Sequence, residues 1–225
     1  MTHLNQLEIV SYVARGAADY TWVEMQPGLE VMARPAMAGH IFLAVSARTA
    51  SACAAALTRP EWIVSLTTPK VEDLIYERAV VRPEPVQLNP QHFDVTSSEA
   101  IAEHSAQLLA RIGAAVPSAL VACGRNWVLS NELLDYPGQA ANYGLFSTTA
   151  PYRSANGQFA VWQPLSLEHD LDHWDYSHLL RLVRRRPGVA LPAYDEPLRV
   201  FELVRACTPL ETRIRDEFPR GDRQS

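Results

Sequence analysis

The segment from Thr96 to Gly113 constrains the fold more than any other part of the chain. Thr96-Ser-Ser-Glu99 matches the capping box, in which the Thr96 hydroxyl and the Glu99 carboxylate satisfy each other's free amides at the start of a helix. Gly113 is placed to end that helix about four turns later. Any fold of this chain must therefore accommodate a long, well-delimited helix near its centre.

A second helix is predicted over residues 69–79, where Thr68 supplies a cap followed by proline at the first helical position. One side of this helix is apolar and is predicted to pack. The other side carries Lys70, Asp73 and Glu77 and is predicted to be solvated and salt-bridged. Lys70 in the first turn also suits the binding of a substrate carboxylate.

Short runs rich in β-branched and aromatic residues surround these helices, and such runs are typical of strands. The predicted strands and strand-like runs are residues 7–13, 20–25, 29–33, 40–45, 62–66, 119–123, 127–130, 142–146, 159–162 and 176–183. An alanine-rich helix is predicted over 46–57, and Asn156-Gly157 suits a hairpin turn. The chain is therefore predicted to be of the α+β class, with a mainly antiparallel sheet and several packed helices. Residues 1–186 are assigned to a single domain, and residues 187–225 to a C-terminal helical extension.

Size, charge and cysteine content narrow the class of protein. A chain of 225 residues can bury a substantial core without disulfides. The net charge of -5 argues against a nucleic-acid partner. The three widely spaced cysteines form no Cys-x-x-Cys motif, and neither a signal peptide nor a run of ~20 apolar residues is visible. These features predict a cytoplasmic protein that acts on a small-molecule substrate and has no membrane partner. The chain could be a monomer or a homodimer.

The stretch from His169 to His178 is the strongest candidate for a site. It holds three histidines and three aspartates within ten residues, and Trp162 and Trp174 flank it. Side chains that carry protons or bind metals are rarely so concentrated in a purely structural segment.

Two chemistries fit this stretch. On a helix, His169 and His173 would share one face as a metal pair, with Asp175 or His178 as third ligand. However, glutamate does not follow the first histidine as it does in the usual zinc motif. In an extended segment the two imidazoles would also stand roughly 13 Å apart, too far for one ion.

The preferred hypothesis is therefore acid/base chemistry without a metal or cofactor. Asp175 or Asp172 would orient a histidine and shift its pKa, so that His173 and Asp175 are the predicted catalytic residues of this stretch. Tyr176 and His178 are predicted to contact the substrate, and the neighbouring tryptophans would supply aromatic walls. A polar hairpin whose histidines cap local backbone groups is the structural alternative.

Three further acid/base candidates lie outside this stretch. Glu84 stands between two prolines that hold it in an extended conformation, which suits a general base but also an exposed connector. His104 falls on the apolar stripe of the helix after Thr96, where it is either a hydrogen-bonded core residue or part of a site. Glu103 leans away from that stripe.

Several blocks resemble those of a set of largely uncharacterised bacterial proteins. They are Leu66-Thr-Thr-Pro-Lys70 with Asp73-Leu-Ile-Tyr-Glu-Arg-Ala79, Asn142-Tyr-Gly144, and Gln163-Pro-Leu165 with Asp175-Tyr-Ser-His178 and Arg181-Leu-Val183. The chain also resembles bacterial Pictet–Spengler cyclases, which build β-carbolines from tryptophan and an aldehyde. This resemblance transfers no catalytic residue to the chain. Gly124-Arg125-Asn126 stands where members of the set tend to have Lys-Lys-Asp, which puts the ligand in doubt.

The resemblance implies a biosynthetic condensation of an aromatic amine with an aldehyde. That reaction needs a base, a cation for the substrate carboxylate and flat apolar walls. Glu84, Glu103 or His104 would be the base, Lys70 or Arg78 the cation, and Trp127 or Trp162 a wall. The rival hypotheses are a metal-dependent amide hydrolase centred on His169, His173 and Asp175, and a non-catalytic module that binds a small ligand.

Overall fold

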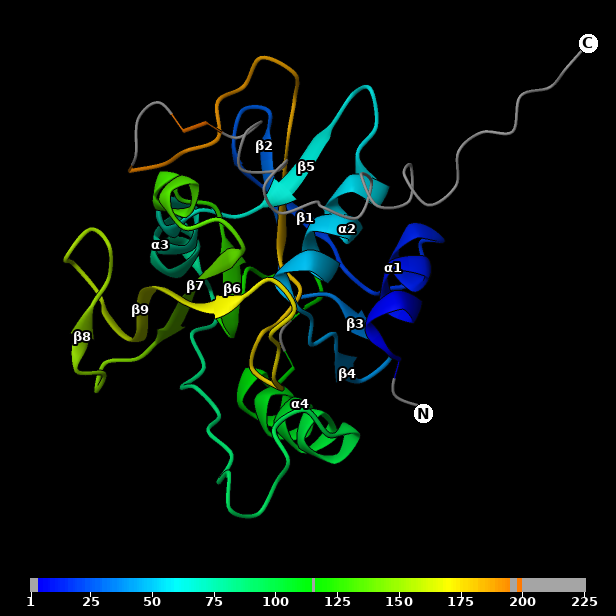
Figure 1. Ribbon diagram of the computed structural model, residues 1–225, viewed down its shortest axis with the longest axis vertical. Helices are drawn as coiled ribbons and strands as arrows, with labels where there is room; N and C mark the ends of the chain where they lie inside the picture. The colour runs from blue at the N-terminus through cyan, green and yellow to red at the C-terminus, as the bar shows by residue number, and fades with distance from the viewer. Residues whose placement is uncertain (1–3, 115, 195–197, 200–225) are drawn as a thin grey trace, which may run out of the picture.

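The computed structural model describes residues 4–114, 116–194 and 198–199, and it confirms the predicted α+β class (Figure 1). The helices are α1 (Gln6–Ala14), α2 (Ala47–Leu57), α3 (Pro69–Arg78), α4 (Ser98–Ile112) and the short 3-10 helix η1 (Asn131–Asp135). The strands are β1 (Trp22–Gln26), β2 (Leu29–Met32), β3 (Met37–Ala38), β4 (Ile41–Phe42), β5 (Ile63–Leu66), β6 (Arg125–Val128), β7 (Gln139–Phe146), β8 (Tyr152–Arg153), β9 (Ala160–Asp170) and β10 (Leu182–Arg185).

Two antiparallel sheets organise the domain. The first has the strand order β1-β2-β10-β5, so the late strand β10 lies between two early strands, with Val183 opposite Val31 on one side and Ser65 on the other. The second has the order β6-β7-β9-β8, and β3 and β4 form a separate pair. A bridge between Thr67 and Val128 connects the two larger sheets. Strands that are far apart in the sequence are therefore neighbours in the first sheet, and the Thr67–Val128 bridge fixes the position of the second sheet relative to the first.

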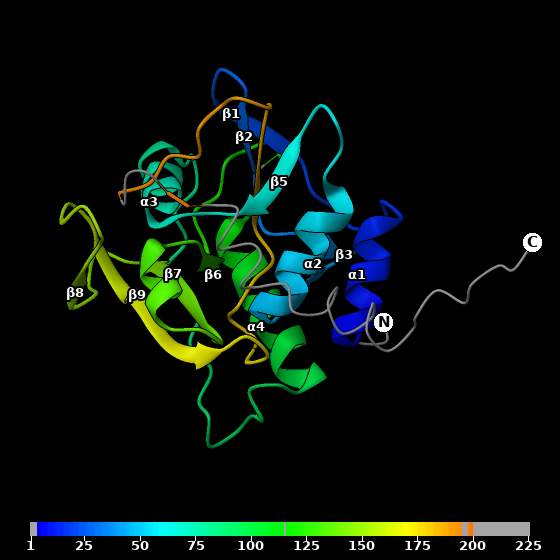
Figure 2. The ribbon, with the colours of Figure 1, turned by 45° about the horizontal axis from the view of Figure 1, so that its top comes forward.

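Strand β9 brings the histidine-rich stretch to the site. It runs from the β8 hairpin at the edge of the molecule towards the centre in both ribbon views (Figures 1 and 2). Its pairing with β7 is irregular between Ala140 and Asn142 and again between Asn142 and Gly144. Such irregularities bend a strand and redirect its side chains. The end of β9 is therefore directed inward rather than along the sheet edge.

The prediction of a strand over residues 7–13 is wrong, because this segment is α1. The Asn5 side chain accepts hydrogen bonds from the amides of Leu7 and Glu8, and the Glu8 carboxylate accepts one from Asn5. Ile9 and Val13, four residues apart, are buried on one face. This capping box and the helical spacing of the two buried residues override the β-propensity of the segment.

Helix α4 confirms the predicted helix but corrects its first residue. The N-cap is Ser97, whose hydroxyl accepts from the amide of Ala100, whereas the Thr96 hydroxyl donates to Asp94. The capping box predicted from Thr96 and Glu99 is therefore absent from this helix. Gly113 ends the helix as expected, with a φ of 67°.

The remaining predictions differ mainly at the ends of elements. Helix α3 begins at the predicted cap, Thr68. The helix predicted over residues 46–57 is α2, and of the two possible caps that the sequence offers, Ser46 and Thr49, Ser46 is the N-cap. Residues 119–123 form no regular strand and contribute a single bridge, at Val121. Within the segment 176–183, the regular strand begins only at Leu182, and the residues before it form a turn and two isolated bridges. On α3 the face predicted to be solvated is partly buried, since Asp73 is 2% exposed and accepts hydrogen bonds from two tyrosines.

The segment after β10 is part of the packed domain as far as it is described. Leu191 and Ala193 are buried, and the Thr68 hydroxyl donates to the carbonyl of Pro192 at 2.5 Å. The predicted linker over 187–192 is therefore anchored to the start of α3. The helix predicted to begin at Asp195 lies almost entirely outside the described residues.

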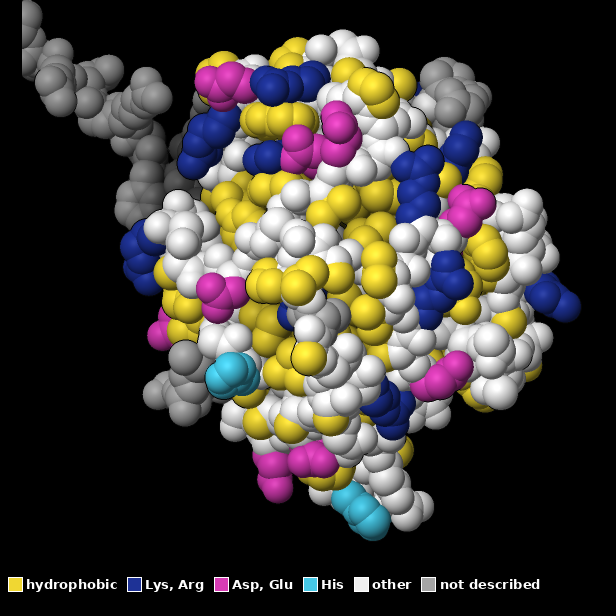
Figure 3. Space-filling view, turned by 180° about the vertical axis from the view of Figure 1, so that it is seen from behind, with side chains coloured by type: hydrophobic (Ala, Val, Ile, Leu, Met, Phe, Trp, Pro, Cys, Tyr) yellow, Lys and Arg dark blue, Asp and Glu magenta, His cyan; other side chains and the backbone are white. Residues whose placement is uncertain are grey.

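The surface carries mixed charge. On the face seen in Figure 3, basic and acidic side chains are dispersed among hydrophobic ones and form no continuous basic surface. This distribution agrees with the net charge of -5. Within the described residues, no helix combines the length and apolar character that a membrane span requires.

The corrected cap of α4 generates a stability prediction. Ser97→Ala is expected to lower the free energy of unfolding by about 1 kcal/mol, because it removes the side-chain acceptor of a free helix amide. Thr96→Ala is expected to change it by less than about 0.5 kcal/mol. Urea unfolding of the two variants checks this, and an equal or larger loss for Thr96→Ala would show that the cap is assigned to the wrong residue.

Candidate functional site

The turn after β9 brings two of the histidines together. The Asp170 carboxylate accepts hydrogen bonds from the amides of Asp172 and His173, at 2.9 and 2.7 Å. This turn folds the chain back, so that the rings of His169 and His173 stack with centroids 3.9 Å apart and planes 3° apart. The expectation of an extended segment with widely separated imidazoles is therefore wrong, because an aspartate side chain ends the strand between them.

Helix α2 holds this turn in place. The amide of Arg48, in the first turn of α2, donates to the carbonyl of Leu171 at 3.0 Å. The guanidinium of Arg48 also binds both carboxylate oxygens of Asp172, at 2.6 and 3.0 Å. Asp172 therefore anchors the turn and does not orient a histidine, which corrects one of the two options drawn from the sequence.

His178 completes a cluster of three imidazoles. It is fully buried and stacks on Trp127, with centroids 4.3 Å apart and planes 2° apart. Its plane stands at 88° to that of His169 and at 86° to that of His173, with centroid distances of 5.5 and 5.3 Å. One ring nitrogen from each of the three lies within 4.8 Å of the others. We call His169, His173 and His178 the imidazole cluster.

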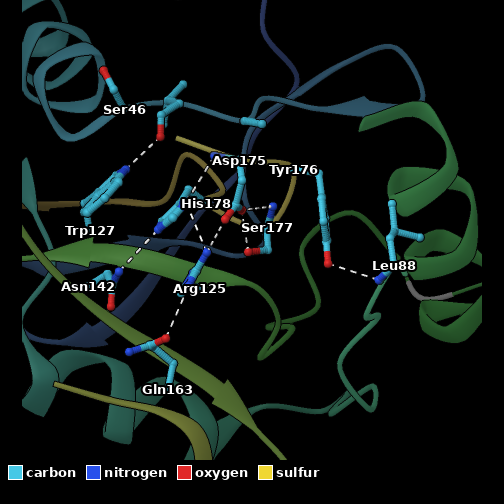
Figure 4. Close-up of polar contacts among 12 residues, drawn as sticks. Ser46, Leu88, Arg125, Trp127, Asn142, Gln163, Asp175, Tyr176, Ser177 and His178 are labelled. Atoms are coloured by element: carbon cyan, nitrogen blue, oxygen red, sulfur yellow. Dashed lines mark hydrogen bonds and ion pairs between the residues drawn. The ribbon is translucent and has the colours of Figure 1, made fainter. Parts of the chain in front are cut away.

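The ring of His178 is fixed from several directions (Figure 4). Its Nδ1 lies 3.2 Å from a carboxylate oxygen of Asp175 and 3.2 Å from the Asp175 amide. Its Nε2 lies 3.3 Å from the side-chain nitrogen of Asn142. Trp127, beneath it, donates its indole N–H to the carbonyl of Val45 at 2.7 Å. Contacts from β6, β7 and the segment before β10 therefore hold one imidazole in a single orientation.

An ion pair between Arg125 and Asp175 borders the cluster. Arg125 Nη2 donates to Asp175, and Arg125 Nη1 donates to Gln163 Oε1 at 3.2 Å. Burial alone would raise the pKa of Asp175. The hydrogen bonds from His178 and Ser177 and the positive charge of Arg125 outweigh burial and hold that pKa below its ordinary value. Asp175 is therefore ionised at neutral pH and balances the charge of the guanidinium.

The imidazoles of the cluster are shifted towards their neutral forms. Burial lowers the pKa of His178 to about 4, although the hydrogen bond with Asp175 acts in the opposite direction. Burial, His173 and Arg125 all lower the pKa of His169. Both imidazoles are therefore uncharged at neutral pH, in the state that can bind a metal ion or accept a proton.

A groove with aromatic walls extends along β9. Its described lining includes Glu168, the residue before His169, but none of the three imidazoles. It has a volume of about 730 Å³. Trp162 is 38% exposed, and Tyr136 and Tyr152 are each 54% exposed on its walls. Gln163 belongs to the groove and also accepts from Arg125, so a polar chain connects the groove with the imidazole cluster.

The structure unites part of the predicted site. His173, Asp175, His178 and Trp127 meet at the imidazole cluster, and Trp162 lies in the adjoining groove. Tyr176 turns away from the cluster: its hydroxyl accepts from the Leu88 amide at 3.0 Å, and its ring centroid lies 5.0 Å from that of His104.

The predicted carboxylate bases outside the stretch have local partners. Glu84 is exposed and accepts a hydrogen bond from Ser147 at 2.5 Å. Glu103 is also exposed and accepts one from Gln107, one turn along α4, at 2.7 Å. Neither carboxylate contacts the imidazole cluster or its groove among the interactions of the described residues.

The predicted cations are also separate from the cluster. Lys70 lies at the start of α3, with its nitrogen 5.8 Å from the centroid of the Tyr194 ring. Arg78, in the last turn of α3, donates to the carbonyl of Met25. Arg125 does contact the site, and the sequence indicated it only as a difference from the bacterial proteins that the chain resembles.

Sequence reasoning missed the support that β6 and β7 give to the site, which comes from Arg125 and Asn142. A sequence signal for their approach is Gly144, opposite Arg125 in the sheet, with a φ of 136°. A Cβ atom there would lie 2.7 Å from the carbonyl oxygen of Gly124. Only glycine allows the two strands to come this close.

The burial of His104 can be tested by measuring how the stability of the protein depends on pH. Burial lowers its pKa to about 4 from 6.5; the charge of Asp175 opposes this shift and that of Arg111 adds to it. Between pH 6.5 and 4 the unfolded chain binds a proton at this residue and the folded chain does not, so stability should fall as the pH falls. The expected loss of unfolding free energy is on the order of 3 kcal/mol over this window.

Urea unfolding should show a shallower pH dependence of stability in His104→Gln, whereas His92→Gln, at an exposed position, should match the unmodified protein. Equal pH dependence in all three would contradict this assignment.

Comparison with known proteins assigns no family to this site. No protein-family model, no curated protein and no solved structure matches the chain. The resemblance to the uncharacterised bacterial set and to Pictet–Spengler cyclases therefore stays a prediction. The chemistry of the site has to be inferred from the imidazole cluster and its surroundings.

Proposed function

We propose that the imidazole cluster binds a divalent transition-metal ion of the zinc class, and that the protein is a metal-dependent hydrolase of amides or esters. The observation that carries this proposal is the placement of three imidazole nitrogens within 4.8 Å of one another. Three histidines are an established ligand set for catalytic zinc, because they leave a fourth position open for water or substrate. The proposal departs from the metal-free chemistry favoured by the sequence, since the separation assumed there between His169 and His173 does not occur.

The electrostatics of the cluster support this choice. A metal ion competes with protons for imidazole nitrogens, so ligands with lowered pKa values are already deprotonated at neutral pH. His169 and His178 both meet this condition. Arg125 Nη2 lies 3.4 Å from Nδ1 of His178, and its ion pair with Asp175 reduces the repulsion that it would exert on a bound ion.

The surroundings of His178 are those of an oriented ligand. In metal sites, a carboxylate commonly accepts a hydrogen bond from the ring nitrogen that does not bind the ion, which fixes the ring and increases its basicity. The Asp175 carboxylate lies 3.2 Å from Nδ1 of His178, a nitrogen that the Asp175 amide and Arg125 Nη2 also face. Trp127 restricts rotation of the ring by stacking on it, so binding of an ion at Nε2 requires only that Asn142 release that nitrogen.

The groove along β9 provides the substrate site. Among the described residues, its lining contains the carboxylates of Glu132 and Glu168 and neither lysine nor arginine. Together with the exposed rings of Trp162 and Tyr152, this composition favours a neutral or cationic substrate with flat or apolar groups. The scissile bond would lie at the Glu168 end, next to His169.

These positions assign a separate role to each part of the site. A metal ion held by the cluster would lower the pKa of a bound water and polarise the carbonyl that the water attacks. The aromatic walls bind and orient the substrate, and Gln163 holds the Arg125 side chain between groove and cluster. Asp175 keeps both His178 and Arg125 in position.

The condensation implied by the resemblance is the second candidate. One observation favours it: His104 contacts Tyr176 and feels the charge of Asp175, so two predicted acid/base groups lie on the same side of the domain. Its other proposed base and cation residues have partners elsewhere. A condensation catalysed in this way would need no metal, so chelation distinguishes the two candidates.

Metal binding generates the first functional prediction. The purified protein, stripped with a chelator and dialysed against Zn²⁺ or Co²⁺, is expected to retain one ion per chain and to unfold at a higher temperature. His169→Ala and His173→Ala should each abolish retention. Asp175→Asn should weaken binding by roughly 10–100-fold, because it removes the orienting carboxylate.

The matched controls are His40→Ala and His92→Ala, which remove exposed imidazoles outside the cluster. They should retain the metal, and the visible spectrum of the Co²⁺ form should be unchanged. Absence of stoichiometric metal from the correctly folded protein, or equal retention by the cluster variants and the controls, would reject the proposal.

Hydrolysis generates the second functional prediction. The zinc-loaded protein is expected to cleave members of a panel of aromatic amides and esters, and to lose and regain activity with chelation and zinc. Trp162→Ala should raise KM by roughly tenfold with little change in kcat, because it removes a binding wall and leaves the cluster intact. Leu7→Ala removes an exposed apolar side chain outside the groove and should leave KM unchanged. Cleavage that persists after complete metal removal would reject the metal-dependent mechanism.

A further inference from the structure

We propose that a second pocket, between α2 and β5, binds a small molecule with an apolar body and a carboxylate. The pocket has a volume of about 400 Å³, within the range of small-ligand sites. None of the residues of the imidazole cluster or the β9 groove contributes to its lining. The proposal is therefore independent of the function assigned above.

The first sheet and α2 build this pocket together. Ile63 pairs with Arg185 and Ser65 pairs with Val183, so Ile63, Ser65 and Arg185 project from the same face of the sheet. On α2 the facing residues are small, with Ser51, Ala54 and Ala55 lining the space. Small side chains on the helix leave a volume that larger ones would fill.

Two polar atoms in the lining, Oγ of Ser65 and Nε of Arg185, have no hydrogen-bond partner among the described residues. Ser65 is 3% exposed, and its hydroxyl forms no hydrogen bond with any described residue. The Nε of Arg185 is likewise buried and unpaired within the described part of the chain. Buried donors without partners are rare, because each loses its hydrogen bonds to water. A ligand that accepts hydrogen bonds from both groups would replace the hydrogen bonds to water that they lose on folding.

The chemistry of these groups selects the ligand. A guanidinium and a hydroxyl are both donors, and the planar guanidinium matches the geometry of a carboxylate. The Arg185 side chain is held by a hydrogen bond from Nη1 to the Val189 carbonyl at 2.8 Å, which leaves Nε for another acceptor. The rest of the lining is mainly apolar, with Leu66 and Leu129 among its residues. An aliphatic or aromatic monocarboxylate satisfies both features.

The decisive experiment titrates the full chain with octanoate by calorimetry. Octanol has the same apolar tail without the carboxylate, and acetate has the carboxylate without the tail. Octanoate is expected to bind at least tenfold more tightly than either, because only octanoate fills the pocket and also accepts from Ser65 and Arg185. Neither metal nor catalytic activity enters the measurement, so its outcome is separate from that of the proposed function.

Variants locate the site. Ser65→Ala and Arg185→Gln are each expected to weaken octanoate binding at least fivefold, and Ala54→Leu should abolish it by filling the pocket. Arg186→Gln is the matched control: it removes the neighbouring guanidinium, which stacks on Trp62, and should leave affinity unchanged. Thermal unfolding verifies that each variant is folded.

Three outcomes would overturn the proposal. They are no octanoate binding by the folded, unmodified protein, equal affinity for octanol and octanoate, and equal weakening by Arg186→Gln and Arg185→Gln. Because Ser65→Ala removes only a hydroxyl group, it tests the polar contact even if Ala54→Leu fails to fold.

Discussion

The stacking of His178 on Trp127 is the interaction on which the candidate site depends. It joins β6, which carries Trp127, to the segment just before β10, and the Trp127 indole continues the connection to Val45 near α2. Burial of the ring removes it from water, so its nitrogens must be satisfied by the protein. Asp175 and Asn142 supply those partners, and the same carboxylate holds Arg125. The buried imidazole is thus a common contact of Asp175, Asn142 and Arg125.

Local signals in the sequence predicted the helices well. Ser46, Thr68 and Gly113 act where the sequence placed helix ends, because capping depends on residues only a few positions apart. The same rule explains the error at residues 7–13. There the Asn5–Glu8 capping box and the burial of Ile9 and Val13 on one helical face outweigh the β-branched composition of the segment.

The site was only partly predictable, because its members are brought together by contacts of different range. The three histidines and Asp175 lie in one stretch, and the concentration of histidine and aspartate in that stretch is enough to indicate a site. Their mutual geometry depends on a single side chain, Asp170, whose hydrogen bonds convert a strand into a turn. Arg125 and Asn142 arrive through sheet pairing with distant segments, for which a single sequence gives no direct signal. Composition therefore located the site, whereas tertiary pairing determined which groups surround it.

The two inferred binding regions share one structural support. Trp127 lies under His178, while Leu129, two residues later, lines the apolar pocket and donates its amide to Thr67. Both residues are almost completely buried, at 1% exposure each. Closely packed interiors resist changes in volume and transmit displacement. One short buried segment, Trp127 to Leu129, thus supports both the apolar pocket and the imidazole cluster.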